Sequence, residues 1–340
     1  MNTYPKNTRE FEMVFRDDEA CLQYLFGIRW PNGYVCPYCQ STGKYWHRSH
    51  GKVKCGKCRR EYSILSDTIF QGTHTPLLVW FKAMWHICLQ KNGMSALGLQ
   101  RSLGMGTYQT AWLCLHKLRK AMVRPGRDKL CGKVEVDETY IGGVREGKRG
   151  RGADGKCLVM VAVEDKDYLD ESTGKTRQCL GRIRMQCIEN ASGKVLAQAI
   201  SDNIEVGSEL VTDGWKGYSS VESHGYGHTI QKTPPRWGKD DETPFGEECI
   251  GDYSSPLLKC HLVISLLKRW ILGTLQGSVG KEHMQDYLNE FTFRFNRRNS
   301  KSRGMLFWRL TQMAVGHEPT TLREIIPPTN SVPQDLGGVN

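Results

Sequence analysis

Val134-Glu-Val-Asp-Glu-Thr-Tyr-Ile-Gly-Gly143 is the stretch of this sequence that best predicts the fold. Apolar and polar residues alternate along it, as in a half-buried β-strand, and the Gly142-Gly143 pair is typical of the turn that ends a strand. Asp137 lies in the middle of this strand, where a carboxylate is unfavourable unless it is paired or binds a metal ion. The stretch therefore predicts a strand that carries a functional acid, with an ordinary edge strand and a solvated Asp as the alternative.

Two further candidate residues come from distant parts of the chain. The apolar run Ser208-Glu-Leu-Val-Thr212 predicts a second strand, which places Asp213 at its C-terminal end. His261 and Lys268 lie seven residues apart in a strongly helical pattern, and seven residues are close to two helical turns. Two strand-borne carboxylates and a helix-borne third ligand make a site for divalent metal ions and phosphate chemistry. A purely structural histidine is the alternative for His261.

The composition favours a nucleic acid over a membrane as the partner. The 340 residues carry a net charge of +11, which attracts polyanions. No apolar run reaches the roughly 18 residues of a transmembrane helix, and the N-terminus lacks the pattern of a signal peptide. Thirteen cysteines, an odd number, indicate free thiols in a reducing compartment. We therefore expect a cytoplasmic, nucleoid-associated protein.

Four of the cysteines, within residues 1–66, have the spacing of a structural zinc site. Cys36 and Cys39 form one C-x2-C pair, Cys55 and Cys58 form another, and fifteen residues separate the pairs. Each pair aims two thiolates at one centre, and two pairs complete a tetrahedral Zn²⁺ site. A short helix with Asp17 or Asp18 as its N-cap precedes this ribbon. Since the ribbon has little core of its own, zinc is expected to supply its folding energy.

Residues 74–124 are expected to be helical and to bind DNA. A helix that ends at Asn92-Gly93, a short helix over 96–103 and a third helix capped by Thr107 predict a helix-turn-helix. A three-helix bundle that only packs is the alternative. The residues of the third helix that could face DNA are Tyr108, Gln109, Thr110, His116, Lys117, Arg119 and Lys120.

Residues 131–316 are predicted to form a mixed α/β domain, and 317–340 a flexible tail. The strands expected beside those of Asp137 and Asp213 cover 157–163 and 181–188, and polar residues at 165–177 and 225–256 are expected to be loops. Expected helices cover 192–200, 257–275, 282–295 and 304–314.

These motifs together resemble the IS1595-type (ISXO2-like) insertion-sequence transposases over roughly residues 15–315. The resemblance rests on the ribbon, the Asp137 strand, and the segments Val211-Thr-Asp-Gly-Trp-Lys-Gly-Tyr218, Ser265-Leu-Leu-Lys-Arg-Trp270 and Glu290-Phe-Thr-Phe-Arg-Phe-Asn-Arg-Arg298. It implies an RNase H-like catalytic domain, a DDE-type mechanism, binding to terminal inverted repeats and a bacterial or archaeal host.

Carried over by position, the resemblance makes Asp137 and Asp213 the first two catalytic acids. Family members often have Glu as the third, seven residues before a helical Lys; here that position is His261, a variant that the family also shows. Glu247, Glu248 and Asp252 remain alternatives for the third ligand. Glu138 would have a supporting role on the opposite strand face.

The expected function is DNA cleavage and strand transfer with two Mg²⁺ or Mn²⁺ ions about 3.5–4 Å apart, in which Lys268 contacts a phosphate. The expected partners are the inverted repeats and target DNA, bound by a homodimer or higher oligomer. A domesticated zinc-ribbon DNA-binding regulator and a metal-dependent nuclease without strand transfer are the alternatives.

Overall fold

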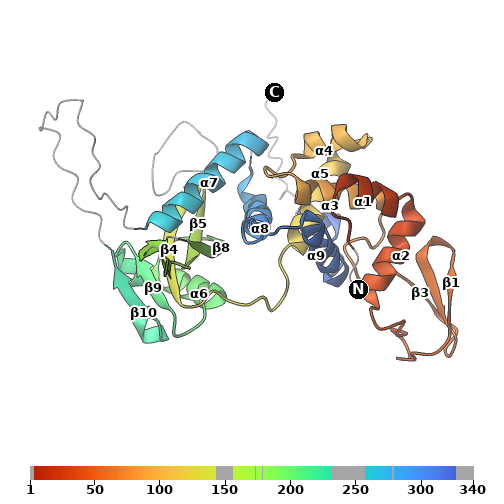
Figure 1. The fold of residues 1–340 in the computed structure, drawn as a ribbon, viewed down its shortest axis with the longest axis horizontal. Coiled ribbons are helices and arrows are strands. Elements are labelled where there is room, and N and C mark those ends of the chain that lie inside the picture. The colour runs from red at the N-terminus through yellow and green to blue at the C-terminus, as the bar shows by residue number, and fades with distance from the viewer. Residues whose placement is uncertain are drawn as a thin grey trace, which may run out of the picture. The chain divides into compact units, whose positions relative to one another are not determined.

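The computed structural model describes residues 4–142, 156–172, 174–177, 179–231, 257–277 and 279–326. The chain divides into two compact units, and both can be followed in Figure 1. Unit 1 is drawn from Met1–Leu89, Ala96–Met122 and Ser302–Asn340, and unit 2 from Gln90–Ser95 and Val123–Lys301.

Unit 1 begins with two helices that lead into the ribbon. The sequence placed one helix here; the structure has α1 (Thr8–Val14) and α2 (Asp18–Arg29), and Asp17 is confirmed as the cap of α2 because its side chain accepts from Ala20 N. The ribbon is a three-stranded antiparallel sheet of β1 (Tyr45–Arg48), β2 (Lys52–Cys55) and β3 (Glu61–Ser63), with the 3-10 turn η1 (Ser49–Gly51) between the first two strands. Arg29 at the end of α2 donates to Ile64 O at 2.7 Å, which ties the helix to the ribbon.

The three helices predicted after the ribbon are present as α3 (Leu77–Leu89), α4 (Ala96–Leu103) and α5 (Tyr108–Ala121). Thr107 caps α5 as expected, with its hydroxyl accepting from Thr110 N. Two of the residues proposed to face DNA need correction. His116 and Arg119 are buried, and Arg119 Nη1 lies 3.4 Å from His116 Nε2, so α5 does not present them to a ligand.

The last long helix, α9 (Arg303–Gly316), packs in unit 1, although it was predicted to end the mixed α/β domain of residues 131–316. The physical reason is an aromatic cluster: Phe307 packs against Phe11, Phe15, Phe81 and Trp85 with ring centroids 5.5–5.7 Å apart. Within the expected tail, residues Leu322–Ile325 form a one-turn helix, α10, which begins in a capping box.

Unit 2 is built on a five-stranded mixed sheet in the order β10-β9-β4-β5-β8. The strands are β4 (Lys133–Ile141), β5 (Cys157–Asp165), β8 (Leu180–Ile188), β9 (Glu209–Thr212) and β10 (Gly227–Ile230). β4, β5 and β8 pair antiparallel, whereas β9 is parallel to both β4 and β10. The short 3-10 turns η2 (Lys216–Tyr218) and η3 (Glu222–His224) connect the last two strands.

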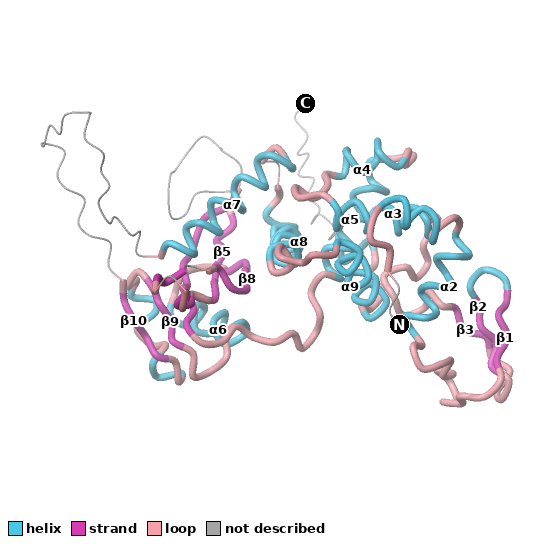
Figure 2. The backbone as a smooth tube through the Cα atoms, in the orientation of Figure 1, coloured by secondary structure: helices cyan, strands magenta, loops and turns pink. Residues whose placement is uncertain are grey.

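Helices cover both faces of this sheet, as Figures 1 and 2 show. α6 (Gly193–Asn203) packs on the core of one face, and α7 (Leu258–Leu275) and α8 (Met284–Phe295), joined through η4 (Lys281–His283), pack on the other. β5 is buried along nearly its whole length because it is covered on both sides. The predicted mixed α/β architecture of this segment is therefore confirmed.

Three short strands lie where the sequence predicted loops. β10 falls in the polar stretch 225–256, and β6 (Tyr168–Asp170) pairs with β7 (Lys175–Arg177) inside 165–177. All are three or four residues long and lack apolar alternation, so no periodic signal marks them. No helix among the described residues has the length and apolarity needed to cross a membrane.

Candidate functional sites

Sheet register brings the two predicted carboxylates together. In the parallel pairing of β4 with β9, Glu135 lies opposite Val211, so Asp137 and Asp213 each follow two residues beyond that pair. Because side chains alternate between faces along a strand, both project to the face on which Val211 contributes to the α7 core. Asp213 comes directly after β9 and its Oδ1 accepts from Trp215 N at 2.9 Å.

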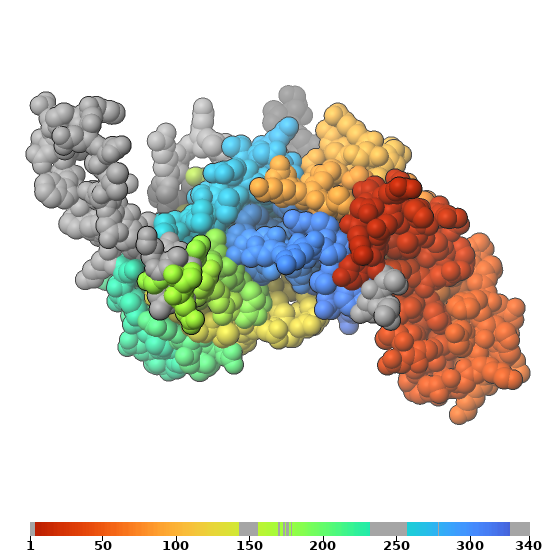
Figure 3. All heavy atoms as spheres, viewed as in Figure 1, coloured from red at the N-terminus to blue at the C-terminus, as the bar shows by residue number. Residues whose placement is uncertain are grey.

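α7 brings the third candidate residue to Asp137. Nε2 of His261 lies 3.4 Å from Oδ2 of Asp137, and the two side chains are 49% and 14% exposed. Val263 and Leu267 face the sheet core, which leaves His261 and Lys268 exposed on the same helix. Residues of α7, drawn light blue, form part of the outer surface of unit 2 in Figure 3. The centre is therefore open to solvent on the helix side and closed on the sheet side.

The pKa of Asp137 is shifted by its burial and by each of these neighbouring groups. Burial raises the pKa of the Asp137 carboxyl above its ordinary value, and the charge of Asp213 raises it further. The Glu138 N–H, which donates to Asp137 Oδ1 at 2.8 Å, and the charges of His261 and Lys268 lower this pKa but do not cancel the increase. Two carboxylates that repel each other beside an imidazole form a donor set that suits a divalent cation.

Of the other candidate acids, Glu138 lies on the opposite face of the sheet, and the remaining three lie outside the described residues. Glu138 projects to the α6 face, where it contacts Tyr218. Burial raises the pKa of the Tyr218 phenol, and the charge of Glu138 raises it further. Glu138 therefore lies across the strand from Asp137, as predicted. Glu247, Glu248 and Asp252 lie outside the described residues.

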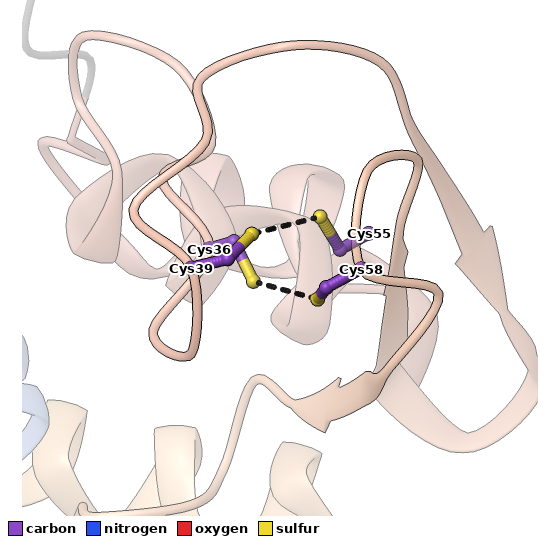
Figure 4. A group of neighbouring side chains, drawn as sticks. All are labelled: Cys36, Cys39, Cys55 and Cys58. Carbon is purple, nitrogen blue, oxygen red and sulfur yellow. Dashed lines mark hydrogen bonds between the residues drawn. The ribbon is translucent and has the colours of Figure 1, made fainter.

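The four ribbon cysteines converge as predicted. Their sulfur atoms all lie within 4.8 Å of one another, with Cys36 Sγ 3.6 Å from Cys58 Sγ and Cys39 Sγ 3.7 Å from Cys55 Sγ. Figure 4 shows the two pairs facing each other from separate turns. Zn–S bonds of about 2.3 Å in a tetrahedron put sulfurs about 3.8 Å apart, so the cluster fits a zinc ion.

The two cysteine turns have the same backbone structure. Gln40 N donates to Cys36 O at 2.9 Å, and Arg59 N donates to Cys55 O at 3.1 Å. Gln40 and Arg59 both have positive φ, 56° and 63°, a conformation that non-glycine residues rarely adopt. Burial raises the pKa of Cys36, but the Cys39 and Tyr38 N–H groups and neighbouring thiols lower it overall to about 6. The first turn thus favours the Cys36 thiolate. On the second turn the Arg60 N–H lowers the pKa of Cys58, but burial and hydrogen bonds with the other thiols raise it overall to about 11.

Comparison with known proteins identifies domains in both parts of the chain. The model of the ISXO2-like transposase domain matches residues 129–296, and that of the transposase zinc-ribbon domain matches residues 16–61. Together the two matches cover more than half of the chain. The chain belongs to the IS1595 family of transposases.

One relative of this IS1595-family protein is an uncharacterised protein in the transposable element ISH50 of Halobacterium salinarum. The two are 23% identical over 306 residues, which cover 83% of this chain and 92% of the relative. The likeness therefore covers most of both proteins.

The ribbon of this transposase has one face rich in cations. Register places Trp46 beside Lys54 and Arg48 beside Lys52 on the outward face of β1 and β2. Arg59 stacks over the Trp46 ring, with its guanidinium carbon 5.4 Å from the ring centroid, and Trp46 is 42% exposed. On the opposite face, Tyr45 and His47 pack against Phe26 of α2. The sequence contains the basic residues of the ribbon but does not show that they share a face.

At the start of α5, Tyr108 and Gln109 are exposed, whereas Lys117 and Lys120 farther along are half-buried. The exposed positions are those that a helix pointing its N-terminus at a groove would use.

Glu135 is a buried residue of the transposase domain that the sequence did not single out as functional. Glu135 lies on the same β4 face as Asp137, and its Oε2 accepts from Cys260 N at 2.9 Å. The only signal in the sequence was its position two residues before Asp137, which puts a second carboxylate on the inward side of the strand.

Proposed function

We propose that this IS1595-family transposase binds the terminal inverted repeats of its element and catalyses metal-dependent DNA cleavage and strand transfer. The observation that carries this proposal is the approach of α7 to β4, with His261 Nε2 3.4 Å from Asp137 Oδ2, on the sheet where the charge of Asp213 also acts on the Asp137 carboxyl. A cluster of two carboxylates and an imidazole on an open face is suited to phosphoryl transfer rather than to holding the fold together.

The RNase H-like assignment of unit 2 is part of the same proposal. Three antiparallel strands followed by two parallel strands, with a helix crossing over from β8 to β9 and another after β10, support it. In this arrangement Asp137 comes from the central strand and Asp213 from its parallel neighbour.

Each residue has a distinct proposed role. Asp137, Asp213 and His261 hold the divalent ions, Mg²⁺ or Mn²⁺, which when bound activate the attacking oxygen and stabilise the leaving oxygen. The attacking group is water during cleavage and a DNA 3′-hydroxyl during strand transfer; one P–O bond forms as another breaks, and no bond forms to the protein. Lys268, exposed on the same helix as His261, contacts a phosphate and holds the strand in line.

Unit 1 supplies the DNA-binding part of the proposal. The cations on the outward face of β1 and β2 contact phosphates, and α4 and α5 form a helix-turn-helix in which Tyr108 and Gln109 reach bases. The protein acts on the nucleoid as a homodimer or higher oligomer, since two element ends must be joined to one target.

The test is an assay of the zinc-loaded full chain on DNA that carries the element's own ends. We expect Mn²⁺- or Mg²⁺-dependent cleavage at the ends, and joining of pre-cleaved 3′-hydroxyl ends to a target plasmid. Cleavage without joining would establish the nuclease alternative. End-specific binding without either reaction in both metals would establish a regulator instead.

A further inference from the structure

The N-terminus of α7 is capped by a residue from the sheet instead of by its own chain. The first backbone N–H groups of a helix have no partner within the helix, and a side chain just before the helix usually accepts from them. Leu257 occupies the N-cap position of α7 and has no side-chain acceptor. Glu135 of β4 takes its place, with Oε2 accepting from Cys260 N at 2.9 Å.

Glu135 is well suited to this contact. Its side chain is 6% exposed, so the bond to Cys260 N–H is shielded from water, and a carboxylate at a helix N-terminus is favoured by the helix dipole.

A second contact holds the same turn of α7. Lys259 Nζ lies 3.0 Å from Asp165 Oδ2 and 2.9 Å from Asp167 Oδ2, at the end of β5. The first turn of α7 is therefore bound to β4 through Glu135 and to β5 through Lys259. His261 is the next residue after Cys260, so this turn determines where its imidazole lies relative to Asp137.

We propose that Glu135 is a positioning residue of the metal centre: by capping α7 at Cys260 it holds His261 at ligand distance from Asp137. The inference rests on the proposed function, in which Asp137 and His261 bind the same metal centre. Glu135 acts through the helix, because its Oε2 is engaged by the backbone of α7 and not turned to the open centre.

The chain offers variants that separate positioning from general packing. Glu135→Gln retains an oxygen that can accept from Cys260 N–H, whereas Glu135→Ala removes it. Glu135→Asp keeps the charge but shortens the reach by one methylene. Val263→Ala is the matched control, since Val263 is a fully buried α7 residue that faces the sheet core beyond the first turn.

The experiment measures Mn²⁺ binding to the zinc-loaded full chain by electron paramagnetic resonance, together with the Mn²⁺ dependence of end cleavage. We expect Glu135→Ala to weaken Mn²⁺ binding about 10-fold or more, as removal of a residue that orients a ligand does. Glu135→Asp should also weaken Mn²⁺ binding, whereas Glu135→Gln should bind Mn²⁺ about as well as the unmodified protein. Val263→Ala should lower the unfolding temperature without weakening Mn²⁺ binding.

Unchanged Mn²⁺ binding in Glu135→Ala, or equal weakening in Glu135→Ala and Val263→Ala, overturns the proposal. If Glu135→Ala does not fold, the contrast between Glu135→Gln and Glu135→Asp decides the same question. Because Mn²⁺ binding is read without DNA, failure of the unmodified protein to cleave element ends would count against the proposed function alone.

Discussion

The cysteine cluster and the proposed catalytic cluster of this transposase are assembled in opposite ways. The ribbon draws four thiols from two turns within residues 36–58, and each turn fixes its own pair through its backbone. The proposed catalytic cluster draws Asp137, Asp213 and His261 from two strands and a helix, and their juxtaposition depends on the sheet register and the docking of α7. The first cluster is local in the sequence, whereas the second exists only in the folded unit.

This difference indicates what each cluster contributes. Four thiols close a tetrahedral site, so a zinc ion there can only hold the ribbon together. The proposed catalytic cluster is open on its helix side, where His261 is 49% exposed, and its carboxylates repel each other. We infer that the zinc-binding cysteines stabilise the ribbon. The proposed catalytic carboxylates, in contrast, lower the folding stability of unit 2 and serve the reaction.

Loss of zinc should unfold the ribbon and leave unit 2 intact. Cys55→Ser, or removal of zinc by a chelator, takes away a binding free energy of about 10–16 kcal/mol, which in such sites is folding free energy. Hydrogen exchange should show loss of protection in β1–β3 and retained protection in β4, β5 and β8. A ribbon that remains protected in metal-free protein would contradict the contrast.

Asp137→Asn and Asp213→Asn should each lower end cleavage by about 10³-fold or more, because each removes a metal-binding charge from the transition state. End binding in a gel-shift assay should stay within about threefold of the unmodified protein, since DNA affinity comes mainly from phosphate contacts elsewhere. Asp202→Asn, an exposed acid of α6, is the matched control and should cleave normally. Equal losses of binding and cleavage would indicate damaged folding instead.

His261→Ala should abolish most cleavage, and His261→Glu should restore part of it by supplying an oxygen ligand. Imidazole suits softer ions, so the unmodified protein should work well with Mn²⁺ and need a higher concentration of Mg²⁺. His261→Glu should shift this preference toward Mg²⁺, which prefers oxygen. Cleavage that is undiminished in His261→Ala with both metals would move the third ligand to Glu247, Glu248 or Asp252.

The same contrast explains how much could be predicted from the sequence. The Cys36–Cys58 spacing was sufficient for the ribbon because the geometry is local. The strands of Asp137 and Asp213 were readable from alternation and apolar runs, but their register was not, since it depends on pairing between distant segments. The cap of α7 by Glu135, the burial of His116 and the packing of α9 in unit 1 all depend on tertiary contacts that leave no periodic signal.

The outward ribbon face should contribute affinity without sequence preference. Arg48 and Lys52 are exposed cross-strand partners, and each phosphate contact adds about 0.9 to the slope of log affinity against log salt. Arg48→Ala with Lys52→Ala should therefore reduce the slope by about 1.8 and weaken element ends and unrelated DNA alike. Arg16→Ala removes an exposed cation from the turn between α1 and α2 and serves as the control. A selective loss of end binding would mean that the ribbon reads sequence.

The smallest effect is on stability, and its sign separates the two clusters. Burial and Asp213 raise the pKa of Asp137 in the folded protein, so the folded state binds this proton more tightly than the unfolded chain does. The resulting stabilisation is complete below the unfolded pKa of about 3.9 and is lost as pH rises through the folded pKa. At pH 7 the ionised carboxylate therefore costs stability, and Asp137→Asn should raise the unfolding temperature of metal-free unit 2 by a few degrees at most. The gain should shrink toward pH 4 and reverse when Mn²⁺ is added, because only the unmodified protein is then stabilised by binding. The measurement is calorimetry of the metal-free protein at pH 7. If Asp137→Asn lowers the unfolding temperature there, this carboxylate stabilises the fold, as the ribbon thiols do.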